Sequence, residues 1–177
     1  MIADPIVIAS YARTPMGGMQ GAFATVPATE LGAIAIRAAV ERAGVAPGAV
    51  DQVIMGCVLP ASLGQAPARQ ASIGAGLPIS VGATTINKVC GSGMKAAMMA
   101  AEAIIAGTSD IVIAGGMESM TNAPYLLTKH RTGARLGHDA LKDSMFLDGL
   151  EDAYEPGRAM GSFAEVTAQD YQFTREA

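Results

Sequence analysis

The sequence predicts an α/β fold with a mostly parallel β-sheet, and two observations support this. Apolar segments suited to strands alternate with segments suited to helices along residues 6–116, from a first strand to a fourth strand with a helix in each interval. This alternation is typical of folds in which helices connect parallel strands. Half of the 177 residues are hydrophobic and only 16% are charged, so a sizeable core can form.

Four segments are predicted as strands. Residues 6–9 form a short apolar run suited to a buried strand, and residues 51–58 read DQVIMGCV. Residues 84–89 are rich in β-branched side chains, which favour the pleated conformation. Residues 110–116 make a fourth strand that is nearly uniformly apolar in its middle.

The first two predicted helices are recognised by their ends. Thr29 can cap a helix that runs to about Ala43, where Gly44 would stop it. A second, short helix is expected over residues 67–76, with Pro67 in its first turn, where a missing N–H group costs nothing.

The third predicted helix, residues 94–106, indicates how the layers are arranged. It ends at Gly107, and apart from Lys95 and Glu102 its residues are apolar or small on every face. A helix that is apolar all round belongs in the interior of a protein. We therefore expect a layered structure in which this helix is sandwiched between layers.

The character of the chain changes after Glu118. Residues 119–177 hold most of the charged side chains and contain no segment comparable to the buried strands. Residues 129–138 include a small basic stretch and both histidines of the chain. Thr174 resembles a helix cap, so the chain stops where a helix should begin, and we expect truncation or cleavage.

Composition excludes several classes of partner. A net charge of −4 and a pI near 5 argue against nucleic acid. Two cysteines are too few for a disulfide framework, which favours a reducing, cytoplasmic setting. Asp4 and Pro5 interrupt the region where a signal peptide would be apolar, and residues 93–107 are too short and too charged for a membrane span. We expect a soluble, cytoplasmic protein without a metal site.

Cys90 is the candidate nucleophile because it lies where a predicted strand meets a helix. The N-terminus of a helix carries partial positive charge and free N–H groups, which favour a thiolate and can stabilise an oxyanion. Gly91 and Gly93 leave room for a substrate near the sulfur. The alternative interpretation is a small buried hydrophobic residue, which we expect for Cys57 in its apolar strand.

Two further interpretations bear on this site. The segment GSGMKA (residues 91–96) also fits a dinucleotide-binding fingerprint. That motif normally belongs to the first strand–helix unit, and here Asp110 begins the next strand instead of ending it. A nucleophilic cysteine also needs a base, yet His130 and His138 lie in a polar stretch suited to a solvated loop. The base is therefore a carboxylate or lies outside these residues.

The segment NKVCGSGMKA (residues 87–96) resembles the active-site cysteine segment of the thiolase family. The segment GGMESM (residues 115–120) is similar to the strand end that follows it in that family. Further matches lie at residues 13–15, 160–161 and 164–165. The resemblance covers the whole chain, in the right order.

Thiolases are about twice as long, with two similar α/β halves and a loop domain inserted in the first. The resemblance implies a layered α-β-α-β-α fold, of which residues 1–119 are the first half, with a mixed sheet and a buried helix. Residues 120–177 would begin the loop domain, cut short. The family's catalytic histidine, second cysteine and water-positioning asparagine belong to the other half and have no counterpart here.

The implied mechanism is ping-pong acyl transfer. Cys90 would take an acyl group from acyl-CoA, helped by the absent histidine, and pass it to the α-carbon of a second acetyl-CoA that the absent cysteine deprotonates. Coenzyme A thioesters are thus substrates, and no cofactor is implied. Met160 corresponds to a methionine beside the acyl pocket and Leu150 to a leucine near the pantetheine, although both could instead be loop packing. Ala159 stands where short-chain thiolases often have a histidine, so one pantetheine contact is in doubt.

The resemblance implies an acetyl-CoA C-acetyltransferase of fatty acid metabolism that needs its C-terminal half, attached or as a separate chain. Family dimers pair the strand that carries Asn87, and residues 129–138 resemble a loop that builds tetramers, so a homodimer or homotetramer is expected. One alternative is a broader-range 3-ketoacyl-CoA thiolase of fatty acid degradation. A ketoacyl-ACP synthase fits the residues around Cys90 less well. A non-catalytic fragment or split subunit that only assembles is the third alternative.

Overall fold

The computed structural model describes residues 5–176. The chain divides into two compact units, Met1–Asn122 and Ala123–Ala177. The division falls close to the predicted boundary between residues 119 and 120, whose assignment to family domains stays a prediction.

The first unit is built on a three-stranded parallel sheet. Strand β1 (Gln52–Gly56) lies in the centre, between β2 (Gly82–Ile86) and β3 (Val112–Gly116). Ile54 of β1 pairs with Thr84 on one side and Ala114 on the other. This confirms the predicted parallel sheet. The mixed sheet implied by the resemblance is represented, among the residues described, by its parallel strands only.

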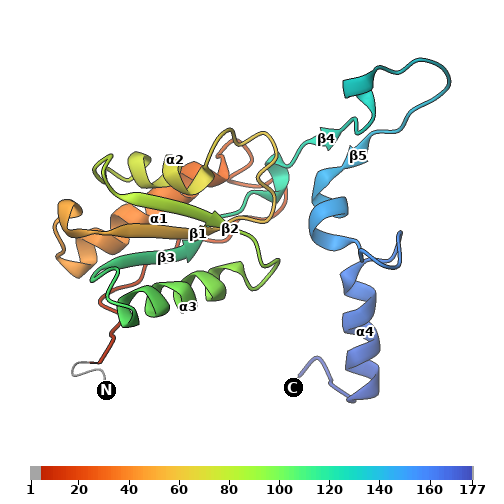
Figure 1. The fold of residues 1–177 in the computed structure, drawn as a ribbon. Helices are drawn as coiled ribbons and strands as arrows, with labels where there is room; N and C mark the ends of the chain where they lie inside the picture. Colours follow the sequence, from red (N-terminus) through yellow and green to blue (C-terminus); the bar gives the residue numbers. More distant parts are fainter. Residues whose placement is uncertain (1–4, 177) are drawn as a thin grey trace. The chain divides into compact units, whose positions relative to one another are not determined.

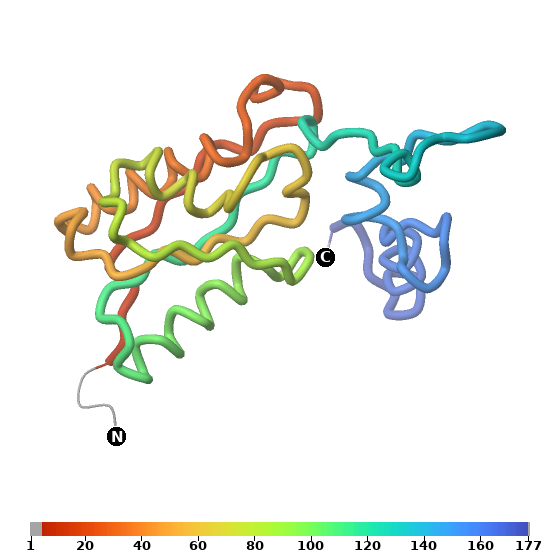
Figure 2. Tube along the Cα trace, turned by 45° about the horizontal axis from the view of Figure 1, so that its top comes forward, coloured from red at the N-terminus to blue at the C-terminus, as the bar shows by residue number. Residues whose placement is uncertain are grey.

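The helices lie on both faces of this sheet, as Figures 1 and 2 show. Helix α2 (Pro67–Gly74) packs on β1 and β2, and α1 (Ala28–Ala43) packs on α2. Helix α3 (Ser92–Ile105) covers the other face, against β1 and β3. Helices on both faces are the usual arrangement around parallel strands.

Helix α1 begins and ends for different reasons than a capping side chain. It starts at Ala28, after the extended Pro27, so the predicted cap at Thr29 is wrong. Proline suits this position because its φ angle is already close to the helical value. Gly44 ends the helix as predicted, with a left-handed φ of 65° that glycine adopts without a steric penalty.

The core of the first unit consists of small and medium apolar side chains between α1, α2 and the sheet. It comprises Ala28, Ala33, Ile36, Val40, Val50, Val53, Met55, Cys57, Ala68, Ala71, Ala75, Leu77, Val81 and Met117. The small residues let the two helices approach closely. A Cβ atom added to Gly74 would lie 3.2 Å from the Cβ atom of Ala33.

The predicted strand at residues 6–9 is wrong in this structure. These residues belong to no strand, and the Val7 and Ile8 side chains are 72% and 88% exposed. The adjoining residues are instead tied to α1, through the Ser10 hydroxyl on the Ala39 carbonyl and the Arg42 guanidinium on the Tyr11 carbonyl. A strand needs a neighbour that supplies hydrogen bonds, and an apolar run alone does not provide one.

Helix α3 is covered on one side only in the part of the chain that the structure describes. Ser92, Ala96 and Ala100 are buried, whereas Met94 and Met98 are 68% and 50% exposed. The predicted sandwiching between two layers is therefore half present, since one layer, the sheet, packs on the helix.

The second unit contains short elements. Strands β4 (Tyr125–Leu126) and β5 (Lys142–Asp143) form an antiparallel pair. A π-helix, η4 (Phe146–Leu150), and helix α4 (Met160–Asp170) follow. Among residues 5–176, no helix combines the length and apolar character that a membrane crossing requires.

Candidate active site

Cys90 lies in the turn between β2 and α3, as predicted from the sequence. Its thiol is free and exposed, so the alternative interpretation as a small buried hydrophobic residue is wrong. Cys57, which follows β1, is 1% exposed and does match that interpretation. The structure thus gives the two cysteines opposite environments, and only Cys90 is accessible to a substrate.

The turn that carries Cys90 has an unusual backbone conformation. Val89 has a φ of 48°, in the left-handed region that β-branched residues rarely occupy. The turn is closed by hydrogen bonds from the Gly91 N–H to the Lys88 carbonyl and from the Ser92 N–H to the Val89 carbonyl, each 3.1 Å long. A residue held in this region costs about 1–3 kcal/mol, so the surroundings must hold it there.

Two side chains hold the turn. The buried hydroxyl of Ser92 accepts a hydrogen bond from the Lys88 N–H (2.8 Å) and donates one to the Val89 carbonyl (2.6 Å). The Asn87 side-chain carbonyl accepts one from the Val89 N–H (2.9 Å). Sequence reasoning missed the role of Ser92, although a serine at the first position of a helix often bonds nearby backbone groups.

Close backbone approach places the start of α3 against the ends of the strands. A Cβ atom on Gly56, at the end of β1, would lie 2.5 Å from the Ser92 Cβ atom. A Cβ atom on Gly93 would lie 3.9 Å from backbone atoms of Gly115 and Gly116. The N–H groups of Gly93 and Met94, in the first turn of α3, have no acceptor within the helix. They are therefore candidates to stabilise negative charge on a substrate oxygen.

The environment of Cys57 suppresses its chemistry. Burial is the main reason that the pKa of this thiol is raised to about 12, and the neighbouring Glu118 carboxylate acts in the same direction. The Cys57 S–H donates to Glu118 Oε1 over 3.6 Å. Because it stays protonated at neutral pH, Cys57 is a poor nucleophile.

Glu118 anchors the segment that follows β1, a role that sequence reasoning missed. Its carboxylate accepts hydrogen bonds from the Val58 N–H (2.8 Å) and the Leu59 N–H (3.0 Å). It also borders a cavity of about 160 Å³, which is lined by Ala12, Arg13, Thr14, Leu31, Ala35, Gly116, Met117 and Glu118. The two hydrogen bonds join residues 60 and 59 positions apart, so local patterns do not reveal them.

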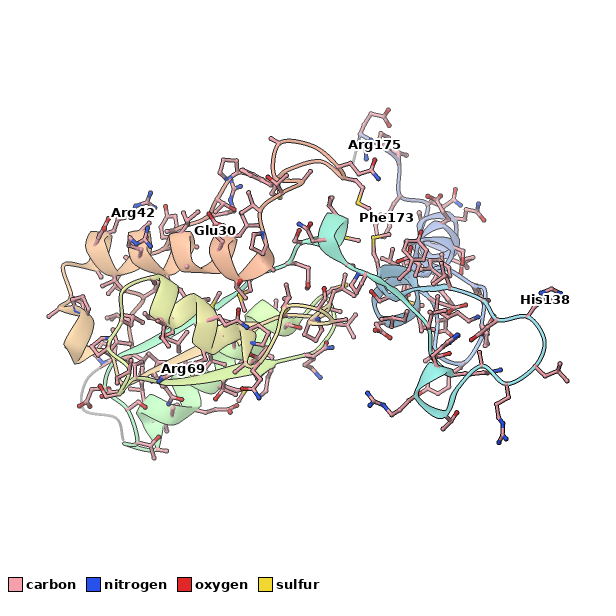
Figure 3. The ribbon with its side chains drawn as sticks, turned by 90° about the horizontal axis from the view of Figure 1, so that it is seen from above. Glu30, Arg42, Arg69, His138, Phe173 and Arg175 are labelled. Carbon is pink, nitrogen blue, oxygen red and sulfur yellow. The ribbon has the colours of Figure 1, made fainter. Side chains whose placement is uncertain are left out.

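Both histidines lie in the second unit. His130 Nδ1 is 3.1 Å from Asp139 Oδ2, and His138 projects from an exposed loop of that unit (Figure 3). Residues 1–122 contain no histidine. The expectation of solvated loop histidines therefore fits the structure, and the first unit offers Cys90 no imidazole base.

The two residues expected near a substrate, Leu150 and Met160, also lie in the second unit. Leu150 is the last residue of the π-helix η4 and is half-buried, while Met160 is the first residue of α4 and is 41% exposed. An isolated antiparallel bridge pairs Glu151 with Ala159, so the two residues flank one feature of the chain. Single-turn π-helices occur frequently at functional sites. Their contacts with a substrate stay a prediction.

No group of three or more metal-binding side chains occurs among residues 5–176. The chemistry available at the first unit is that of an exposed thiol in a rigid turn, beside backbone N–H groups at the start of a helix that have no acceptor within it.

Comparisons with known proteins agree with this site. The family model described as "Thiolase, N-terminal domain" matches residues 6–177. "Acetyl-CoA acetyltransferase 2" of Arabidopsis thaliana is 56% identical over 171 residues, which are 97% of this chain and 42% of that protein. The acetyl-CoA acetyltransferase of Cupriavidus necator is 56% identical over 172 residues, covering 97% of this chain and 44% of that protein.

A solved structure shares the fold. The Acat5 thiolase from Ascaris suum, in complex with coenzyme A, superposes with a TM-score of 0.88 at 41% identity, covering 96% of this chain and 44% of that one. The chain therefore spans less than half the length of these relatives.

Proposed function

This chain belongs to the thiolase family, and we propose that it supplies the acyl-accepting cysteine of an acetyl-CoA C-acetyltransferase. The observation that carries the proposal is the exposed Cys90 thiol in a turn locked by Ser92 and Asn87. The relatives named above are acetyl-CoA acetyltransferases of more than twice this length. We propose that activity requires a second half, and the assembled enzyme means this chain together with that half.

The proposed reaction has two steps. The Cys90 thiolate attacks the carbonyl carbon of acetyl-CoA, the carbon–sulfur bond to coenzyme A breaks, and coenzyme A leaves as a thiol after accepting a proton from an acid in the second half. A second acetyl-CoA then loses an α-proton to a base, and its α-carbon attacks the acetyl-Cys90 thioester. Acetoacetyl-CoA forms and the Cys90 thiolate is released. The reverse reaction is thiolysis of a 3-ketoacyl-CoA.

The residues of this chain contribute geometry to both steps. A tetrahedral intermediate places negative charge on the former carbonyl oxygen, and the N–H groups of Gly93 and Met94 are suited to stabilise it. We propose that Leu150 and Met160 line the path of the pantetheine and the acyl group. This assignment is supported by their common position at the Glu151–Ala159 bridge.

Acetyl labelling tests the proposal directly. The assembled enzyme is treated briefly with acetyl-CoA that carries a labelled acetyl group and is then mapped by peptide mass spectrometry. We expect the label on the peptide that contains Cys90, and none in Cys90→Ser, which keeps its fold because this side chain is exposed. Cys57→Ala is the matched control and keeps the label. Thiolysis by Cys90→Ser at more than a small fraction of the wild-type rate would remove Cys90 from the mechanism.

A second candidate is a chain that only assembles with other chains. The observations that favour it are the coverage of 42% and 44% of the relatives and the exposed apolar residues Met94, Met98 and Ile105 on α3. We expect no turnover from residues 1–177 alone. A range of acyl chain lengths, tested on the assembled enzyme, separates an acetyl-specific enzyme from a broader-range 3-ketoacyl-CoA thiolase.

A further inference from the structure

We propose that Glu118 is a positioning residue for Cys90, which acts through the backbone segment behind the nucleophile's turn. The inference rests on the proposed function, because it assigns a role in acyl transfer to a carboxylate whose hydrogen bonds go to residues 57–59 and not to Cys90. Its chemistry is that of an anchor and involves no proton transfer to the substrate.

The first link is the attachment of residues 58 and 59 to the end of β3. Both oxygens of the Glu118 carboxylate accept backbone N–H groups, from Val58 at 2.8 Å and from Leu59 at 3.0 Å. The neighbouring Met117 N–H donates to the Gly56 carbonyl at 2.9 Å. Hydrogen bonds to a charged acceptor are about twice as strong as neutral ones, so this segment is held firmly.

The second link joins the same segment to the residues before Cys90. The Cys57 N–H donates to the Ile86 carbonyl at 3.0 Å, and the Asn87 side-chain amide reaches the Val58 carbonyl at 3.5 Å. The other end of the Asn87 amide accepts the Val89 N–H at 2.9 Å. Asn87 therefore connects the segment held by Glu118 to the strained residue beside the nucleophile.

The third link is steric. Gly56 leaves no room between the end of β1 and Ser92, since a Cβ atom there would overlap the Ser92 side chain at 2.5 Å. A shift of the backbone around Gly56 therefore also moves Ser92, whose hydroxyl closes the turn. Two routes thus lead from the Glu118 carboxylate to the position of Cys90.

This arrangement has a consequence for acyl transfer that stability alone does not require. N–H groups just after a strand end can be satisfied by water, whereas a half-buried carboxylate is costly unless fully paired. A reacting group must be placed to within about 0.5 Å, and a misplacement of about 1 Å can cost about 100-fold in rate. A carboxylate anchor behind the nucleophile supplies such placement.

The test compares Glu118→Gln with Glu102→Gln in the assembled enzyme. The amide that replaces the Glu118 carboxylate accepts one N–H and turns its own NH₂ group toward the other, so one anchor is lost. Glu102 lies on α3 and pairs with Lys95 in an exposed bridge, so its replacement is a chemically matched control. Three quantities are measured for each protein: the rate of Cys90 acetylation by acetyl-CoA, the rate of Cys90 alkylation by iodoacetamide, and the melting temperature.

We expect Glu118→Gln to lower the rate of acetylation about 10- to 100-fold, mainly in kcat, while alkylation by the small reagent changes less than about twofold. Glu102→Gln should change neither rate. A purely structural role would lower the melting temperature and leave the ratio of the two rates at the wild-type value, and that result overturns the proposal. Equal acetylation of wild type and Glu118→Gln also overturns it. Failure of the wild-type enzyme to acetylate Cys90 would instead overturn the proposed function.

Discussion

Replacing Ser92 by alanine tests whether the turn that carries Cys90 is held by a single hydroxyl. The substitution removes the acceptor of the Lys88 N–H and one of two donors to the Val89 carbonyl, while the Ser92 N–H bond to that carbonyl remains. Each lost hydrogen bond is worth about 0.5–1.5 kcal/mol. Because Lys88 is exposed, water can reach its freed N–H group. The expected loss is therefore about 1–3 kcal/mol.

This loss falls on the conformation of the turn. With Val89 at a φ of 48°, relaxation of the backbone is favourable once the hydroxyl is gone. If the whole loss of about 1–3 kcal/mol comes from the preference for the native turn, acetylation of Cys90 slows by about 5- to 150-fold. The assay is the rate of labelling by acetyl-CoA in the assembled enzyme, together with urea unfolding.

Ser109→Ala is the matched control for this experiment. Ser109 is also buried and accepts a hydrogen bond from the Gln52 side chain at 2.7 Å, at the opposite ends of the strands from Cys90. We expect a similar loss of stability and an unchanged rate of acetylation. A wild-type rate in Ser92→Ala, or an equal decrease in both variants, would refute the assignment of the turn to Ser92.

Three further outcomes are expected. Gly56→Ala forces a Cβ atom to 2.5 Å from the Ser92 Cβ atom, so the free energy of unfolding should fall by about 1–3 kcal/mol, whereas Gly48→Ala, with open space around it, should change it by less than about 0.5 kcal/mol; equal values would contradict the close packing. The raised pKa of Cys57 means that the folded chain holds its proton more tightly than the unfolded chain, so its contribution to stability is complete below its ordinary pKa of 9.0 and is lost as pH rises toward about 12; the stability difference between wild type and Cys57→Ala, measured by urea unfolding from about pH 8 to about pH 11, should therefore shift against the wild type, and a constant difference would contradict the assignment. Cys90→Ser should abolish acetyl labelling and leave the melting temperature within about 1–2 °C of wild type, because the thiol is exposed.

The sequence by itself determined most of the local structure of the first unit. Three of the four predicted strands and all three predicted helices are present, with ends shifted by a few residues. These elements follow from short-range properties: β-branched residues, continuous apolar runs, and a glycine such as Gly44 that ends a helix. The position of Cys90 between a strand and a helix follows from the same patterns.

Tertiary structure decided the properties that depend on distant partners. Residues 6–9 have the composition of a strand but join none, because pairing requires a neighbour that an apolar run does not specify. The two cysteines are the same residue type, yet burial and the Glu118 carboxylate make Cys57 hard to ionise, whereas Cys90 is exposed. The anchors of the turn likewise bring together Gly56, Ser92 and Glu118 from different parts of the chain.

The physical reason is the range of the forces involved. Helix and strand preferences arise from steric contacts within a few residues, which a sequence displays directly. The exposure of a thiol, the left-handed conformation of Val89 and the pairing of a carboxylate with backbone N–H groups depend on what the fold places alongside them. The sequence therefore identified the candidate nucleophile, and only the folded chain showed what holds it in position.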